Sequence, residues 1–376
     1  YGTAARTFID KSVTMHQKKE RPMSALDLLK KLTTTPGVPG REHRIRQLIL
    51  DEIEDIFDEI CIDSLGSIIA VKKPAPKKGK VAKNPLRIML AAHMDQIGFL
   101  VSHIDDKGFL YLNPVGGFDT RNLFARVVTV CPNPNDPSKD LTGILNPSGK
   151  PIHVASPEER KRIPTVREFI VDLGIDRKRV EKNVKIGDMV VINAPVHYLG
   201  DLMVSQAMDN RAACWIAIEA CRKLKNHSCE IHCVFTVQEE VGLRGATASS
   251  HTIQPDIGIG IDTTLAVDTP SVPAHEACTR LGDGAAITVM DSSAIGDYDL
   301  IETFDALGKK HKIKTQRSIL AAGGTDTGGL QRTAGGCRAM TLSCPTRYIH
   351  TVTETIHTGD IKACRDLLAT YLESAK

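Results

Sequence analysis

Residues 212–224, AACWIAIEACRKL, and the segment EIHCVFTVQEE at 230–240 decide the fold class. The first segment is apolar almost all round, which is typical of a helix that is buried on every side. The second is rich in β-branched and aromatic residues and then ends in two glutamates, as a buried strand does where it leaves a sheet. A buried helix that is followed directly by a buried strand predicts an α/β domain.

The same alternation continues on both sides of this stretch. Apolar runs bounded by turn residues predict strands, and apolar residues at helical spacing predict helices. We expect strands at 60–71, 86–92, 256–261, 285–290 and 337–343, and helices at 24–32, 42–57, 243–251, 298–308 and 360–374. Strands that alternate with helices predict a mixed sheet with helices on both of its faces.

The middle of the chain has a different character. Residues 98–194 are rich in Gly, Pro, Asn and β-branched residues, with short strand-like runs such as GFLYLNPV and ARVVTVC between closely spaced turns. This pattern predicts a small β-rich domain inserted into the α/β domain, which is thereby divided into 23–97 and 195–376. Residues 1–22 lack the apolar run of a secretory signal, and we expect them to form a mobile tail.

Composition excludes several classes of protein. The 376 residues include 48 Lys and Arg against 45 Asp and Glu, a net charge of +3. So small an excess argues against an overall electrostatic grip on nucleic acid or on an anionic membrane. Because no run of 18 apolar residues occurs, we expect no membrane span. The ten cysteines form no C-x-x-C pair, which predicts buried free thiols and a cytoplasmic protein.

Familiar catalytic motifs are missing from the sequence. It contains no G-x-x-x-x-G-K-[ST] phosphate loop, no G-x-G-x-x-G dinucleotide fingerprint and no G-x-S-x-G nucleophile turn. The run HEACT at 275–279 fails as the zinc motif H-E-x-x-H, because Thr279 stands in place of the second histidine. These absences count against kinases, dinucleotide enzymes, α/β-hydrolases and thermolysin-like proteases.

Ionisable side chains gather instead near the ends of predicted strands. They are His93 and Asp95 after LRIMLAA, Glu239 and Glu240 after the strand at 230–237, Asp262 after PDIGIGI, His350 shortly after MTLSC, and Asp209 just before the buried helix. In open α/β sheets, ligands bind beyond the carboxyl ends of the strands. Imidazole and carboxylate ligands without thiolate suit zinc, cobalt or manganese, so the pattern predicts a metallohydrolase.

Spacing suggests roles for some of these side chains. His93 and Asp95 are two residues apart, so the carboxylate could hold the second nitrogen of the imidazole ring. Glu239 and Glu240 are adjacent and point in different directions, so one can bind metal while the other acts as general base. Two metal ions close together need a shared carboxylate, and Asp209 could supply it.

Eight motifs in order resemble one known family. They are HMDQIGFLV, NPVGGFD, VDLGI with VKIGD, MDNRAAC, QEEVGLRGA, IDTTLAVDTP, GGTDT and CPTRYIHT, spread over most of the chain beyond the first residues. The family is the M42 metallo-aminopeptidases, the glutamyl and deblocking group, some of which assemble as tetrahedral shells. The resemblance implies a zinc-peptidase (phosphorylase/hydrolase-like) core and an inserted PDZ-like domain at 98–194 that mediates dimer or dodecamer assembly.

The resemblance also implies a metal site. His93 and Asp262 would bind one divalent ion, Glu240 and His350 would bind the second, and Asp209 would bridge both. Zinc is the favoured metal, with cobalt or manganese as alternatives.

The same resemblance implies the catalytic roles. Glu239 would be the general base that activates the water attacking the peptide carbonyl, and Asp95 would orient the metal-binding histidine. The implied reaction is the removal of N-terminal residues from peptide substrates. Two alternatives remain: an endoglucanase-type glycoside hydrolase, which could use paired carboxylates, and a catalytically inactive assembly subunit.

Overall fold

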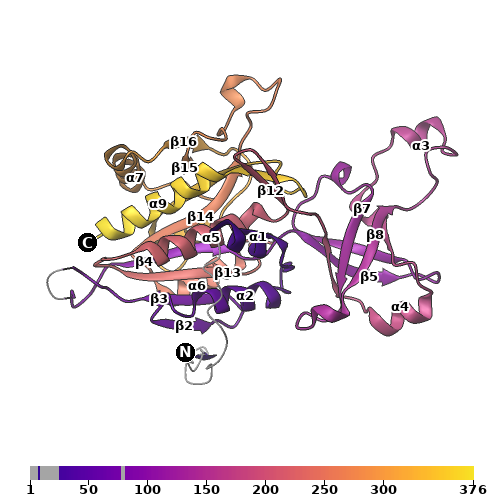
Figure 1. The fold of residues 1–376 in the computed structure, drawn as a ribbon, viewed down its shortest axis with the longest axis horizontal. Coiled ribbons are helices and arrows are strands. Elements are labelled where there is room, and N and C mark those ends of the chain that lie inside the picture. The colour runs from indigo at the N-terminus through magenta and orange to yellow at the C-terminus, as the bar shows by residue number, and fades with distance from the viewer. Residues whose placement is uncertain (1–6, 9–24, 78–80) are drawn as a thin grey trace.

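A mixed sheet of twelve strands forms the larger part of the molecule (Figure 1). The structure is a computed structural model, and it describes residues 7–8, 25–77 and 81–376. Four neighbouring strands in the centre of the sheet run parallel: β13 (Glu230–Thr236), β4 (Arg87–His93), β14 (Ile257–Leu265) and β17 (Arg338–Arg347). The prediction of an α/β fold with a mixed sheet is therefore confirmed.

Antiparallel strands extend the sheet at both sides. On one side follow β3 (Ile68–Lys72), β2 (Glu59–Ile62) and β1 (Thr7–Phe8), and on the other β18 (Glu354–His357), β12 (Leu202–Ser205) and β11 (His197–Leu199). A branch of two strands, β15 (Ala285–Met290) and β16 (Thr315–Ile319), lies against β17. Apart from β1, the expected tail at 1–22 lies outside the described residues.

The single strand expected at 60–71 is instead a hairpin of β2 and β3. The carboxylate of Asp63 accepts hydrogen bonds from the backbone N–H groups of Leu65, Gly66 and Ser67, and Gly66 has a φ of 106°. An aspartate that caps its own turn beside a glycine with positive φ reverses the chain. The apolar run alone did not reveal this turn.

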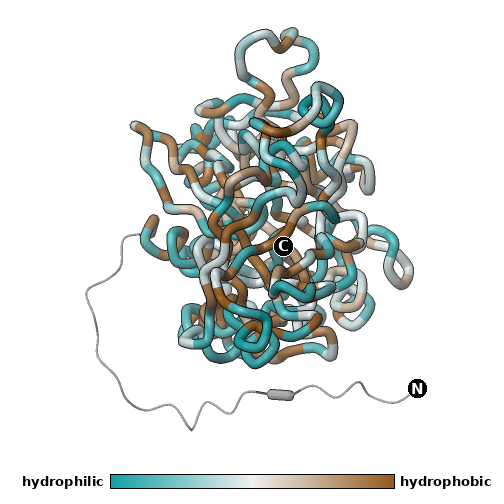
Figure 2. Tube along the Cα trace, turned by 90° about the vertical axis from the view of Figure 1, so that its right-hand side faces the viewer, coloured by the Kyte–Doolittle hydropathy of each residue, from teal (hydrophilic) through white to brown (hydrophobic). Residues whose placement is uncertain are grey.

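Helices cover both faces of the sheet. One face carries α1 (Ala25–Thr34), α2 (His43–Ile53), α5 (Met208–Lys223), α7 (Tyr298–His311) and α9 (Thr358–Ser374), and the other carries α6 (Arg244–Ile253) and α8 (Thr327–Gln331). Side chains along β4 alternate between the two layers: Leu90 packs with the first group and Met89 with the second. Figure 2 shows the apolar segments gathered in the interior and the polar ones in the outer loops.

The contact between α8 and β14 is unusually close. A Cβ atom at Gly260 would lie 2.1 Å from the Oγ1 atom of Thr327. The same hydroxyl contacts the Thr341 hydroxyl at 2.7 Å, so it is not free to move aside. Glycine at this position lets the short helix approach the sheet.

Residues 98–192 contain a closed barrel that lies at one end of the molecule (Figure 1). Its strands, in order around the barrel, are β10 (Met189–Ile192), β5 (Gly98–Ile104), β6 (Leu110–Val115), β9 (Phe169–Asp172), β8 (Leu141–Pro147) and β7 (Arg126–Cys131). Two helices, α3 (Pro157–Lys161) and α4 (Arg177–Asn183), lie between its strands in sequence. The barrel has a hydrophobic core of its own, with Phe99 and Phe169 fully buried.

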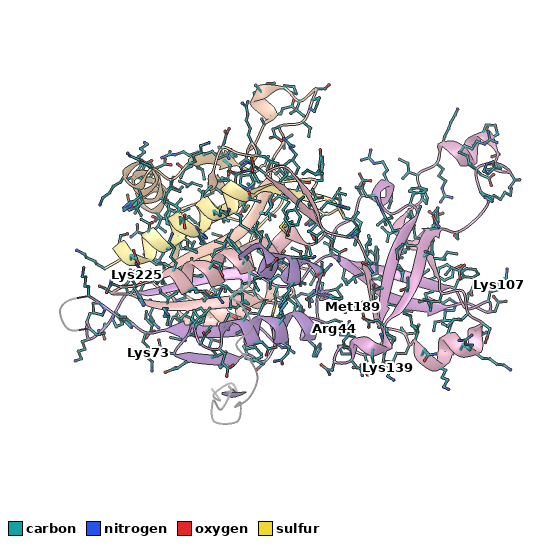
Figure 3. The ribbon with its side chains drawn as sticks, viewed as in Figure 1. Arg44, Lys73, Lys107, Lys139, Met189 and Lys225 are labelled. Carbon is teal, nitrogen blue, oxygen red and sulfur yellow. The ribbon has the colours of Figure 1, made fainter. Side chains whose placement is uncertain are left out.

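The barrel and the large sheet are joined by two short crossings and several side-chain contacts. The chain enters the barrel between β4 and β5 and leaves it between β10 and β11. The guanidinium of Arg44 on α2 binds both carboxylate oxygens of Asp140 at 2.7 Å, and the backbone N–H of Val38 contacts the Met189 sulfur at 3.4 Å. Figure 3 shows Arg44 and Met189 where the two parts meet.

Two further observations concern the cysteines and the helices. All ten cysteines are free thiols, and eight of them are buried. None of the helices in the described part of the chain has the length and apolar character that crossing a membrane requires.

Candidate metal centre

The candidate residues meet at the carboxyl edge of the parallel strands. β4 ends at His93, which pairs in register with Thr236 at the end of β13, so the turn that follows β13 brings Glu239 and Glu240 beside the histidine. Asp262 lies in the neighbouring strand β14, which continues past it to Leu265. Asp209 opens α5, and His350 lies between β17 and β18. Segments far apart in the sequence thus supply one site.

The carboxylate of Asp209 lies between two imidazoles. Its Oδ1 atom is 3.2 Å from Nε2 of His93, and its Oδ2 atom is 3.5 Å from Nε2 of His350. The Nε2 atom of His350 is also 3.4 Å from Oε2 of Glu240. Each oxygen of Asp209 therefore faces a different histidine, which is the arrangement of a carboxylate shared by two sites.

Two further acidic side chains face the same nitrogen of His93. Its Nε2 atom is 3.8 Å from Oε2 of Glu239 and 4.0 Å from Oδ1 of Asp262. The ligand atoms of His93, Glu239 and Asp262 all lie within 4.8 Å of one another, as do those of His93, Asp209 and Glu240. Two overlapping groups of nitrogen and oxygen ligands therefore share one histidine.

Asp95 is placed differently from these ligands. The Nδ1 atom of His93 is 3.1 Å from the backbone oxygen of Asp95 but 3.6 Å from its Oδ1 atom, which is longer than a hydrogen bond. The two carboxylate oxygens instead accept the backbone N–H groups of Glu239 and Glu240, each at 3.1 Å. In this structure the backbone of Asp95 contacts the ring of His93, and its side chain holds the glutamate turn.

A second carboxylate, which the sequence reasoning missed, holds the same turn. Oε1 of Glu42 accepts the backbone N–H of Gln238 at 3.2 Å and that of Gly40 at 2.8 Å. Three successive N–H groups, 238 to 240, are thus held by Glu42 and Asp95. Glu42 begins a predicted helix, where an acidic residue normally faces solvent, so the sequence carried no signal for its burial.

Two further buried acids were also missed. Glu354 accepts the backbone N–H of Asp209 at 3.0 Å and that of His350 at 2.7 Å, and so ties together the segments that carry them. Asp326 accepts the hydroxyl of Thr236 at 2.5 Å. The only sequence signal was the motif GGTDT, which contains Asp326, and the spacing of four residues between His350 and Glu354.

Burial dominates the electrostatics of the site. It raises the pKa of Glu239, Asp262 and Glu354 well above the ordinary range, and it also raises that of Glu240. Burial by itself would raise the pKa of Asp209 too, but hydrogen bonds to His350 and His93 outweigh it and lower that pKa. The site therefore holds more carboxylate than its two imidazoles can neutralise.

These observations fit a divalent cation. Oε1 of Glu240 is buried and has no hydrogen-bond partner among the described residues. A buried carboxylate is costly unless a partner or a metal compensates its charge. The ligand set of imidazole nitrogen and carboxylate oxygen suits zinc, cobalt or manganese. A cavity of about 510 Å³ opens over the side chains of the two groups and over His350, which gives a substrate access to them.

Comparison with characterised sequences gives consistent matches. The family model described as M42 glutamyl aminopeptidase matches residues 66–367. A putative aminopeptidase of Acetivibrio thermocellus is 39% identical, covering 91% of this chain and 96% of that protein. The lysyl aminopeptidase of Pyrococcus furiosus is 32% identical, covering 93% of this chain and 97% of that protein.

Solved structures agree in fold over nearly the whole chain. An aminopeptidase from Desulfurococcus kamchatkensis superposes with a TM-score of 0.86 at 33% identity, covering 94% of this chain and 95% of that chain. The TET1 peptidase of Pyrococcus horikoshii, described as able to form a tetrahedron or a large octahedral shell, gives 0.80 at 29% identity, with coverages of 93% and 100%. A Thermotoga maritima protein described as an endoglucanase gives 0.73 at 28% identity, with coverages of 92% and 96%.

The family match spans well over half of the chain, and the relatives named for an activity on peptides align over nearly all of it. The motifs noted in the sequence lie within or beside the matched range, and the buried ligand groups occupy the carboxyl edge of the same sheet. The chain therefore belongs to the M42 glutamyl aminopeptidase family and is a peptidase that removes N-terminal residues from peptides.

Proposed function

We propose that the aminopeptidase centre holds two divalent metal ions. His93 and Asp262 would bind one ion, Glu240 and His350 the other, and Asp209 would contact both. The observation that carries this proposal is the pair of Asp209 oxygens, 3.2 Å from His93 and 3.5 Å from His350. Zinc is the metal that we favour, with cobalt or manganese as alternatives, because all three accept nitrogen and oxygen ligands.

When bound, such ions polarise a peptide carbonyl and make a water a stronger nucleophile. The chain's own residues handle the proton. We assign Glu239 as the base that takes a proton from the attacking water and passes it to the departing amine. Asp95, through its bond to the N–H of Glu239, keeps that carboxylate in place.

We also propose that the barrel, within residues 98–194, is a PDZ-like dimerisation domain inserted between the catalytic segments 23–97 and 195–376. Its outer surface carries exposed apolar side chains, among them Val127 and Ile144 with exposures of 42% and 45%. These support assembly as a dimer or a dodecamer, in line with the shells described for the Pyrococcus horikoshii relative. Free thiols throughout the chain support a cytoplasmic location.

Metal content and substrate specificity test this function together. Purified protein is stripped with a chelator, reloaded with zinc, cobalt or manganese, and analysed for bound metal. We expect about two ions per chain, no activity when stripped, and recovery on reloading. Amino-acyl anilides and short linear peptides serve as substrates, and head-to-tail cyclic peptides, which have no N-terminal residue to remove, serve as the control that an aminopeptidase does not cleave.

Three results would contradict the proposal. Peptide hydrolysis that persists after the metal is removed would exclude a metal mechanism. Hydrolysis of cellulose oligomers without hydrolysis of peptides would favour the glycoside hydrolase. Two bound ions with no turnover of any amino-acyl substrate would favour an inactive assembly subunit.

A further inference from the structure

The cavity over the metal centre has a second wall that the metal chemistry does not use. One end is formed by the proposed ligands and base. The remaining lining residues are all uncharged: Leu243, Leu265, Leu320, Ala322, Ile349, Thr263, Thr264, Thr325, Gly323 and Gly324. Five of these are aliphatic, and Leu320 is only 9% exposed. An apolar surface thus lies directly beside the place where a peptide would be cut.

Among the described residues of this wall, none carries a charge that could pair with a charged substrate side chain. Among the described residues that line the cavity there is no Lys or Arg, and each carboxylate is a proposed metal ligand or the base. Arg347, two residues before Ile349, is occupied by Asp268, whose Oδ2 atom lies 2.8 Å from its Nη2 atom. Its positive charge is therefore already neutralised.

A neighbouring cavity leads to the same conclusion. It lies on the other side of Asp209 and His350 and measures about 30 Å³, room for about one water molecule. Its only further acid is Glu354, whose two oxygens already accept the N–H groups of Asp209 and His350. The larger cavity, with its aliphatic wall, is therefore the one that has room for the first side chain of the substrate.

We propose that this chain prefers peptides whose first residue has an uncharged aliphatic side chain, such as leucine or methionine, over those that begin with lysine, arginine or glutamate. The inference rests on the proposed function. An aliphatic side chain gains free energy when it leaves water for this wall. A charged one loses its hydration without finding a partner. The preference differs from the glutamyl and lysyl activities that name the family and one relative.

Leu320 is the residue that we assign as the main determinant. It follows β16 directly and lines the cavity, whereas its neighbour Ile319 is 60% exposed and does not. Leu320→Asp places a carboxylate in the wall, where a lysine side chain could pair with it. Ile319→Asp adds the same charge one residue away, outside the cavity, and is the matched control.

Steady-state kinetics on the metal-loaded protein test the proposal with leucyl, methionyl, lysyl, arginyl and glutamyl anilides. We expect kcat/KM for leucine to exceed that for lysine and glutamate by about 100-fold, the scale on which a pocket rejects a poorly matched group. In Leu320→Asp, the lysine-to-leucine ratio should rise about tenfold or more, while Ile319→Asp should keep the wild-type ratio. Leu265→Asp, at a site 37% exposed, replaces Leu320→Asp if that variant does not fold.

Binding of the product amino acids gives a second measurement that does not depend on turnover. In calorimetry, leucine should bind more tightly than lysine or glutamate. The inference is overturned if lysine or glutamate is the better substrate or the tighter product, or if Leu320→Asp leaves the ratio unchanged. If no anilide is hydrolysed although leucine binds best, the proposed function fails and the preference of the cavity stands.

Discussion

Individual acidic residues determine what this site can do. The hydrogen bonds that hold their backbone N–H groups matter as much as the positions of their carboxylate oxygens. Glu239 and Glu240 are adjacent, but each has its N–H held by a different oxygen of Asp95. Their side chains then reach toward different histidines, His93 and His350. Two neighbouring glutamates can therefore take different roles, which a flexible pair on a surface could not.

The role of Glu239 can be separated from metal binding. Glu239→Gln keeps the size of the side chain but cannot take up a proton, so we expect turnover to fall by about 10²–10⁴-fold. Bound metal, measured by elemental analysis, should stay at the wild-type level. Glu158→Gln, on the exposed helix α3, is the matched control and should change neither quantity. Turnover close to wild type in Glu239→Gln would remove the base from the mechanism.

The raised pKa of Glu42 predicts a specific dependence of the free energy of unfolding on pH. Burial, and secondly the charge of Asp95, raises its pKa from 4.5 to about 7. A carboxyl group whose pKa is higher in the folded state stabilises the protein while protonated, and this contribution is lost as the pH rises through its folded pKa. Glu42→Gln cannot ionise. Relative to wild type, the variant should therefore gain about 3 kcal/mol of unfolding free energy between about pH 4.5 and pH 7.5.

Urea denaturation of both proteins across this pH range measures the difference. Glu158→Gln again serves as the control, since that side chain is exposed. A difference between Glu42→Gln and wild type that does not change with pH would mean that Glu42 is not the buried, ionisable group that holds the turn before Glu239.

The sequence could place some site residues but not others, for a physical reason. His93 ends one apolar strand and Glu239 comes three residues after another, so the apolar pattern by itself predicts that they lie at a sheet edge. Glu42 and Glu354 act through hydrogen bonds to backbone groups of other segments. Such contacts depend on tertiary packing and leave no local pattern in the chain.

At the scale of elements, the approach of α8 to β14 depends on one missing side chain. In Gly260→Ala, the new methyl group would meet the Thr327 hydroxyl. We expect this overpacking to lower the free energy of unfolding by about 1–3 kcal/mol and to lower the melting temperature accordingly. Gly335→Ala is the control, because a Cβ there has nothing within 4 Å. Equal melting temperatures for the two variants would contradict the close contact.

Short strands were the elements that the sequence could not predict. β11 has three residues, and β12 and β18 have four each, which is too few for an alternating pattern to stand out. They are held by pairing with one another and with β17. Long elements with a strong pattern, such as α5 and α9, could be predicted because their own residues carry the signal.

At the scale of the whole molecule, the barrel surface makes a prediction about assembly. Val127 and Ile144 are paired across β7 and β8, and both are exposed. If this face mediates self-association as proposed, the double variant Val127→Glu, Ile144→Glu should form a smaller assembly in solution. The reason is that like charges would be buried at an apolar contact between subunits. Native mass spectrometry or light scattering measures the size of the assembly.

The control for this experiment is Ile295→Glu, which changes an apolar side chain of 68% exposure outside the barrel. It should leave the mass unchanged. If the double variant and the wild type form assemblies of equal size, the subunits associate through another surface. Metal content in both variants shows whether the catalytic part is intact.

The two connections between the sheet and the barrel bear on how metal binding and subunit assembly influence each other. The chain enters the barrel five residues after His93, at Gly98, and after leaving it forms two short strands and reaches Asp209. One proposed ligand thus ends the strand before the barrel, and another follows the first two strands after it. Two binding equilibria on one protein obey reciprocity. If assembly changes the affinity for metal, metal changes the affinity of one subunit for another by the same factor, so metal supply would then influence the proposed self-association.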